Sequence, residues 1–118
     1  ADFIGFSNLI EGKIASVDEE AGLAFVDTPI GRLACDNMLG YKEGENVLIA
    51  IRPENITFNK DGLKCQIVKS AFIGEAMLYW LKVSDITLCA KVHSSLDLSC
   101  GSEVHIQLQP NHCKIVKI

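Results

Sequence analysis

The stretch GENVLIAIRPENI, residues 44–56, decides how this chain folds, because an apolar run ends there on an arginine, a proline and a glutamate. Residues 47–51 are aliphatic and show no helical spacing, which predicts a buried strand. Pro53 has no N–H group to donate to a neighbouring strand, so the pairing must end or bend at that residue. Alternation of apolar and polar residues resumes at Ile56, where we expect a further strand.

The same pattern occurs a second time, in GSEVHIQLQPNHC, which begins at Gly101. Gly44 falls on Gly101 and Pro53 on Pro110 at a constant offset of 57 positions (101 − 44). An internal repeat of this kind predicts two small β-units in tandem within one domain that spans residues 1–118. We place the first unit at about residues 8–58 and the second at about 62–118. Each is too small to bury its strands well alone, so we expect the two units to share strands or to pack face to face.

Short apolar runs separated by turn-forming residues fill the rest of the chain. Strands at a spacing of roughly 8–12 residues are typical of an all-β barrel or sandwich, so we predict an all-β fold with little helix. One of the expected turns lies at residues 59–62, where Asn59 and Gly62 flank two charged residues. We expect strands at residues 9–17, 23–27, 32–34, 47–51, 56–58, 63–68, 77–83, 86–92, 103–108 and 114–116.

Composition excludes several classes of partner. The chain has 118 residues, a hydrophobic share of 48% and a formal net charge of −4, which together predict one acidic globular domain. Proteins that bind phosphate backbones or anionic membranes carry clustered Lys and Arg. We therefore expect no nucleic-acid partner.

The residues that could carry chemistry do not form a recognisable catalytic or metal-binding pattern. The five cysteines include no Cys-x-x-Cys pair, so we expect reduced thiols that pack as small apolar side chains. A phosphate-binding loop is also missing, because six residues separate Gly5 from Gly12 and Ile14 stands where a hydroxyl is needed. We predict that this fragment is not an enzyme and has no catalytic, cofactor-binding or metal-binding residues. The alternative metal ligands that we considered are Cys89, His93, Cys100, His105, His112 and Cys113.

Three motifs in a fixed order give the chain a resemblance to a known family. They are Phe3-Ile4-Gly5 followed by Asn8, the triplet Arg52-Pro53-Glu54 at a strand end, and a second FIGE at residues 72–75. Together they resemble the carboxy-terminal TOBE domain of the ATP-binding subunits of bacterial ABC importers. The resemblance covers essentially the whole chain and implies two tandem OB-like β-barrel units.

The resemblance also implies a function and a set of partners. We expect a regulatory and dimerisation domain that couples to ATP-driven uptake of a small solute. Its partners are then its own ATPase domain, a second copy of the subunit and, indirectly, the membrane permease. The resemblance places it in the cytoplasm at the inner face of the plasma membrane. The ATPase domain, with its ATP and magnesium, is expected to be absent from this chain.

A second function remains open at this point. Similar domains sense an oxyanion such as molybdate, or another solute, between subunits. Turn amides, hydroxyls and basic side chains capture such anions, and Lys69-Ser70 and Ser94-Ser95 are the candidates here. The motifs look closer to polyamine, ferric-ion, phosphonate or sulfate importers than to the maltose type.

Five residues are the candidates for a structural or regulatory role: Arg52, Pro53, Glu54, Gly74 and Glu75. Arg52 and Glu54 flank the proline at the expected crossover between the two units. One interpretation is an internal ion pair that pins the crossover. The other is that both side chains face a groove or a partner, where the planar guanidinium of Arg52 suits a carboxylate or an oxyanion.

Overall fold

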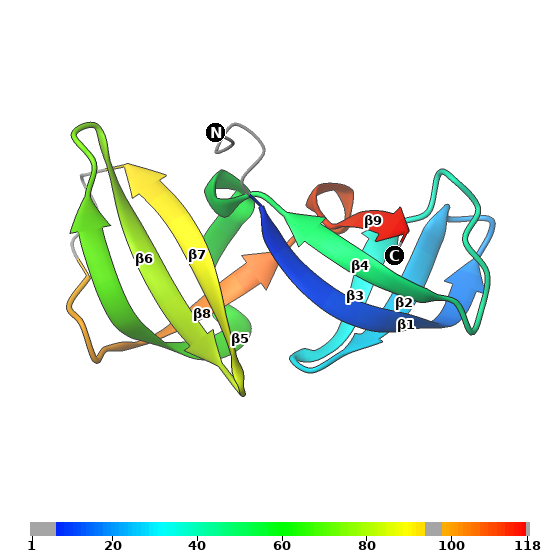
Figure 1. The fold of residues 1–118 in the computed structure, drawn as a ribbon, viewed down its shortest axis with the longest axis horizontal. Coiled ribbons are helices and arrows are strands. Elements are labelled where there is room, and N and C mark those ends of the chain that lie inside the picture. Colours follow the sequence, from blue (N-terminus) through cyan, green and yellow to red (C-terminus); the bar gives the residue numbers. More distant parts are fainter. Residues whose placement is uncertain (1–6, 94–97, 118) are drawn as a thin grey trace. The chain divides into compact units, whose positions relative to one another are not determined.

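The computed structural model describes residues 7–93 and 98–117, and they form an all-β fold (Figure 1). Two three-residue 3-10 turns, η2 (Pro53–Asn55) and η3 (Pro110–His112), interrupt the strands. The predominance of strands confirms the predicted all-β fold class. The strands are β1 (Asn8–Asp18), β2 (Leu23–Thr28), β3 (Gly31–Asp36), β4 (Asn46–Ile51), β5 (Ile56–Phe72), β6 (Ala76–Val83), β7 (Ile86–His93), β8 (Glu103–Leu108) and β9 (Lys114–Lys117).

The first unit is a closed barrel with the strand order β1-β2-β3-β9-β4. All neighbours pair antiparallel except β3 and β9, which are parallel. Val47, Ile49 and Ile51 of β4 are fully buried, while the residues between them are half-buried. Each such side chain contributes about 1.5–3 kcal/mol when it leaves water. The unbroken apolar run of β4 therefore reflects a barrel strand that buries alternate side chains in the core and half-buries those between them.

The second unit is a four-stranded sheet with the order β7-β6-β5-β8. Its core includes Tyr79, Leu81, Ile67 and Ile106, all nearly inaccessible to water. β5 is continuous from Ile56 to Phe72, so the turn predicted at residues 59–62 is wrong.

The reason for this error lies in the β5–β8 contact. A Cβ atom on Gly62 would lie 2.0 Å from the backbone oxygen of Ile106. The glycine therefore permits a close approach of two backbones within a sheet and does not mark a turn. Asn59 accepts a hydrogen bond from the N–H of Asp61 (3.0 Å), so its turn-like bonding occurs inside the strand.

The two halves of the predicted repeat share the local geometry of their turn glycines. Gly44 and Gly101 have φ of +92° and +89°, a conformation that favours glycine. The N–H of Gly44 donates to the carbonyl of Ile14, and that of Gly101 to the carbonyl of Ile67. Both isoleucines are buried and precede a β-bulge, in β1 and β5 respectively. The bulges therefore align the first halves of the two repeats.

The division of the chain differs from the predicted boundaries of 8–58 and 62–118. One compact unit comprises the residues up to Ile51 and those from Leu108 onward, and the other comprises Arg52–Gln107. β9 returns to the first unit because its residues pair with β4, with Ile115 opposite Ile49. Among the described residues each strand belongs to one sheet, so the expected sharing of strands is not found. Instead, the segment after η2 continues the first repeat but belongs to the second unit. The segment after η3 ends the second repeat but belongs to the first unit.

No helix within residues 7–93 and 98–117 is long and apolar enough to span a membrane.

Candidate functional site

The Arg52-Pro53-Glu54 triplet lies where the chain passes from the first unit to the second. Arg52 is the N-cap residue of η2, Pro53 is its first residue, and the N–H of Asn55 donates to the carbonyl of Arg52 (3.0 Å). A proline suits this position, because its fixed φ matches the turn and its missing N–H is not needed there. Pro53 is buried and η2 lies beside β7. The proline thus fixes the start of the second unit.

The two charged neighbours of Pro53 do not form the expected ion pair. Arg52 and Glu54 are both exposed, and within the described part of the chain neither takes part in an ion pair. The buried proline between them anchors the turn and leaves both side chains in water. The ion-pair interpretation is therefore not supported, and both groups remain accessible to a partner.

Asn8, the last residue of the first family motif, begins β1 and contacts the chain just before this crossover. Asn8 is buried and donates from Nδ2 to the carbonyl of Ile51 (3.1 Å), the residue before Arg52. This bond satisfies a backbone acceptor at the end of β4. Phe3, Ile4 and Gly5, the other residues of that motif, lie outside the described residues.

Gly74 and Glu75 form the turn between β5 and β6. Gly74 has a φ of +96°, and the N–H of Ile73 donates to the carbonyl of Ala76 (2.8 Å) to close the turn. Glu75 is exposed. No hydrogen bond or ion pair in the described chain joins this turn to Arg52 or Glu54, so the five candidates do not form one site.

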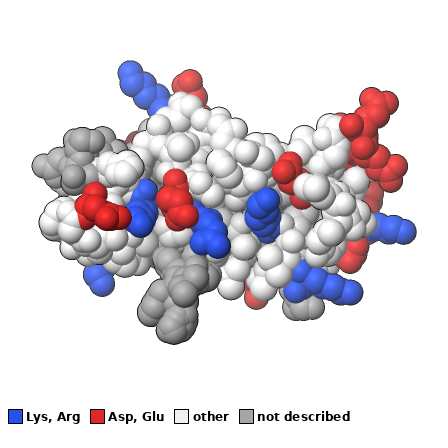
Figure 2. Space-filling view, turned by 90° about the horizontal axis from the view of Figure 1, so that it is seen from above, with Lys and Arg blue, Asp and Glu red and all other residues white. Residues whose placement is uncertain are grey.

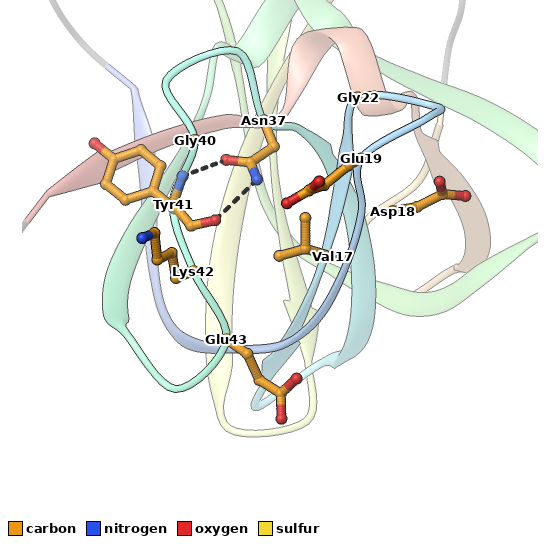
Figure 3. Close-up of a pocket in the computed structure, with 9 residues that line it drawn as sticks. All are labelled: Val17, Asp18, Glu19, Gly22, Asn37, Gly40, Tyr41, Lys42 and Glu43. Atoms are coloured by element: carbon orange, nitrogen blue, oxygen red, sulfur yellow. Dashed lines mark hydrogen bonds between the residues drawn. The ribbon is translucent and has the colours of Figure 1, made fainter.

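A hollow of about 550 Å³ lies in the first unit, between the β1–β2 turn and the loop that follows β3 (Figure 3). The side chain of Asn37 holds this loop, because it donates to the carbonyl of Tyr41 (3.0 Å) and accepts from the N–H of Tyr41 (2.9 Å). Asp18, Glu19 and Glu43 contribute three carboxylates to the lining, against the single ammonium group of Lys42. The hollow is therefore acidic and suits a cationic ligand better than an anion.

The sequence alone does not reveal this hollow, because a charged turn such as that of Asp18 and Glu19 indicates only a solvated hairpin tip, and the loop opposite carries no distinctive motif. That loop comes to the hollow through tertiary contacts, including a hydrogen bond from the N–H of Asn37 to the carbonyl of Gly22 (2.9 Å). The only local signal was Asn37 followed by Gly40, a pattern common in ordinary turns.

The second unit carries a hollow whose charged lining is more basic than acidic. Its volume is about 400 Å³ and its lining includes Lys64, Gln66, Lys82 and Glu103. Lys64 lies 3.6 Å from Glu103, whereas Lys82 has no ion-pair partner in the described chain. Lys69 and Ser70, the predicted anion-binding pair, do not line this hollow. The Nζ atom of Lys69 lies over the ring of Trp80, 4.8 Å from the ring centroid. Ser94 and Ser95 lie outside the described residues.

In the part of the chain that the structure describes, cysteine and histidine side chains do not converge on a metal site. No group of three or more metal-ligating side chains occurs within residues 7–93 and 98–117. Burial raises the pKa of Cys65 to about 11, which keeps this thiol protonated and unreactive at neutral pH.

Charged side chains of both signs lie on the surface of the described residues. On the face seen in Figure 2, acidic side chains gather in one cluster, while basic and acidic side chains alternate elsewhere. The described residues of that face present no broad basic patch.

The fold defines a class: a small all-β module that combines a closed barrel with a four-stranded sheet. A family model for the TOBE domain matches residues 49–116, so the chain belongs to the TOBE domain family. This is a non-catalytic domain, which confirms the prediction that the fragment is not itself an enzyme.

Two relatives extend the comparison. Over 93 residues the chain is 27% identical to the spermidine/putrescine import ATP-binding protein PotA of Chromobacterium violaceum. This match covers 72% of the chain but only 26% of the relative. The solved structure of the cytoplasmic molybdate-binding protein ModG superposes with a TM-score of 0.77 at 13% identity, covering 94% of this chain and 96% of that one. The likeness to ModG confirms the predicted fold of two OB-like units.

Proposed function

We propose that this chain is the carboxy-terminal regulatory and dimerisation domain of the ATP-binding subunit of an ABC importer. The observation that carries the proposal is its membership of the TOBE family together with its similarity to about a quarter of an import ATP-binding protein. The resemblance of its motifs to polyamine-type importers agrees with the name of that relative. The domain would then work in the cytoplasm, at the inner face of the membrane, through its ATPase domain and the permease.

Exposed apolar side chains support a role in assembly. Met38 and Leu39 of the first unit are 88% and 80% exposed, and Phe72 and Ile73 border the β5–β6 turn of the second. Large apolar side chains gathered at a loop tip are typical of surfaces that contact other proteins.

Sedimentation velocity of the 118-residue chain over a wide range of concentrations tests the dimerisation. The proposal predicts a reversible monomer–dimer equilibrium that weakens when Met38 and Leu39 are both replaced by Ser. Replacement of the exposed Ser70 and Asp85 provides the control. A chain that remains monomeric at every concentration would contradict self-association by this domain.

A second candidate function is the sensing of a small solute, and the two hollows favour it. The acidic hollow beside Asn37 suits a di- or polyamine, and the hollow with Lys64 and Lys82 suits an oxyanion. A ligand at one hundred times its Kd adds about 2.7 kcal/mol of stability. Thermal unfolding with spermidine, putrescine, molybdate and sulfate, with sodium chloride as the ionic control, distinguishes the two ligand classes. No shift with any of these compounds would reject sensing by the isolated domain.

A further inference from the structure

Two buried thiols lie side by side where the last strand returns to the first barrel. Cys35 belongs to β3, Cys113 directly precedes β9, and both are fully inaccessible to water. Asp36 and Lys114 are partners in the parallel pairing of these strands. Residues at the same level of adjacent strands point to the same face of a sheet. Cys35 and Cys113, each one position earlier, are therefore lateral neighbours on the core side.

The second unit has no such pair at the equivalent place. Ile56 lies 57 positions before Cys113 and is buried where a segment enters the second unit. Ala90 occupies in β7 the place that Cys35 has in β3, when the pairings are counted from the bulges of β5 and β1. Apolar side chains fill the second junction, so packing at this junction does not require two sulfur atoms.

The two thiols differ in their readiness to ionise. A hydrogen bond from Cys35 lowers the pKa of Cys113, although burial opposes this effect. The same hydrogen bond, burial and the nearby charge of Asp36 raise the pKa of Cys35. Cys113 is therefore the thiol that loses its proton first, and the thiolate is the reactive form.

We propose that Cys35 and Cys113 form a redox-sensitive pair that closes to a disulfide and fastens the last strand to the first barrel. Lateral neighbours in adjacent strands have Cα atoms about 5 Å apart, within the range of about 4.4–6.8 Å that a disulfide spans. β9 has only four residues, and short strands open locally at lower free energy than the core. Local opening of β9 gives a small oxidant access to the pair.

The oxidant in this step is a peroxide. The Cys113 thiolate attacks one oxygen of hydrogen peroxide, so an S–O bond forms, the O–O bond breaks and hydroxide leaves. The sulfur of Cys35 then attacks the sulfenic sulfur: the S–S bond forms, the S–O bond breaks, and the departing hydroxide takes the proton of Cys35 and leaves as water. The two thiols lose two electrons and two protons in total, and the peroxide becomes two molecules of water.

The experiment uses the 118-residue chain with the substitution Cys100→Ser, because Cys100 is exposed and would link separate chains. The folded protein is treated with hydrogen peroxide, unfolded, labelled with a maleimide and digested for mass spectrometry. We expect two of the four remaining thiols to be lost, a linked peptide that joins Cys35 to Cys113, and full recovery after dithiothreitol. Slower hydrogen exchange in β4 and β9 after oxidation would show that the strand is fastened.

Two variants make the outcome specific. Cys35→Ala, which copies Ala90 of the second unit, should abolish the linked peptide, whereas Cys65→Ala, at another buried thiol, should leave it unchanged. Retention of all four thiols in the folded protein, or equal loss of Cys65 and Cys89, would overturn the proposal. A linked peptide without any change in the exchange of β9 would overturn the fastening role.

Discussion

Pro53 determines the geometry of the crossover at the residue scale. It is buried at the first position of η2, while Arg52 and Glu54 on either side are exposed. Burial of an apolar ring stabilises the turn, and solvated charges contribute little to stability. The charged residues of the triplet are therefore free for contacts outside this chain.

Replacement of Arg52 tests this assignment. Since the side chain is exposed and has no ion pair in the described chain, Arg52→Ala should change the free energy of unfolding by less than about 0.5 kcal/mol in urea denaturation. Pro53→Ala, the matched change, should cost about 1 kcal/mol, because it removes buried apolar surface and a conformational restraint. A loss of more than about 1 kcal/mol on Arg52→Ala would restore the ion-pair interpretation.

Among the described glycines, Gly62 has the least space for an added Cβ atom. A Cβ atom there would overlap the backbone oxygen of Ile106 at 2.0 Å, and backbone cannot rotate away as a side chain can. Gly62→Ala should therefore destabilise the chain by about 2 kcal/mol or more. The neighbouring Asp61→Ala, at an exposed side chain, should be nearly neutral. Similar midpoints for the two variants in urea would show that β8 does not cross β5 at Gly62.

At the scale of elements, the β2–β3 hairpin carries an exposed ion pair. Arg32 donates from Nε to Asp27 at 2.7 Å, and this hydrogen bond lowers the pKa of the Asp27 carboxyl. A depressed pKa contributes stability above the unfolded value, and this contribution is lost as the pH falls through the folded value. The contribution therefore disappears in acid and not near neutral pH.

Substitution of Arg32 should show directly that its hydrogen bond lowers the pKa of Asp27. In Arg32→Ala the pKa of Asp27 should rise toward the ordinary value of an aspartate, which NMR titration of the carboxyl carbon can follow. An unchanged titration of Asp27 would contradict the pairing in solution.

The turn glycines of the two glycine–strand–proline segments should lose similar amounts of stability when each is replaced by alanine. Gly44 and Gly101 both have positive φ and precede β4 and β8. An L-residue in this conformation costs about 1–2 kcal/mol, so Gly44→Ala and Gly101→Ala should each be destabilising by a similar amount. Chemical denaturation of the two variants measures this. A large difference between them would mean that the two turns are not equivalent.

The sequence was most informative where local residue chemistry sets the structure. The offset between Gly44 and Gly101 and the two prolines predicted the repeat, because positive φ and a missing N–H are properties of single residues. The course of β5 could not be predicted in this way. Gly62 carries a turn signal locally, but its role comes from the approach of β8, which lies more than forty positions later in the chain.

The candidate site shows the same limit. The pattern around Pro53 identified Arg52 and Glu54 as candidate residues. That the two charged side chains remain unpaired depends on the burial of that proline, which the pattern does not show. The acidic hollow was missed because its two walls, near Asp18 and Asn37, are brought together by the barrel. The return of β9 to the first unit likewise depends on its pairing with β4.

At the scale of the whole molecule, the two repeats complete each other's units. The segment after η2 belongs to the second unit, and the segment after η3 belongs to the first. Neither repeat therefore contains all the strands of one unit, which explains why the chain folds as an internally paired duplication.

The most direct test is to measure ATP hydrolysis by an assembled importer whose ATP-binding subunit carries this chain, with and without residues 1–118. If the proposed function holds, hydrolysis persists when the domain is removed, because the proposal places the nucleotide site in the separate ATPase domain. It also predicts that hydrolysis then no longer depends on solute delivery by the binding protein. Hydrolysis that keeps its full dependence on solute after removal of the domain would contradict a regulatory function.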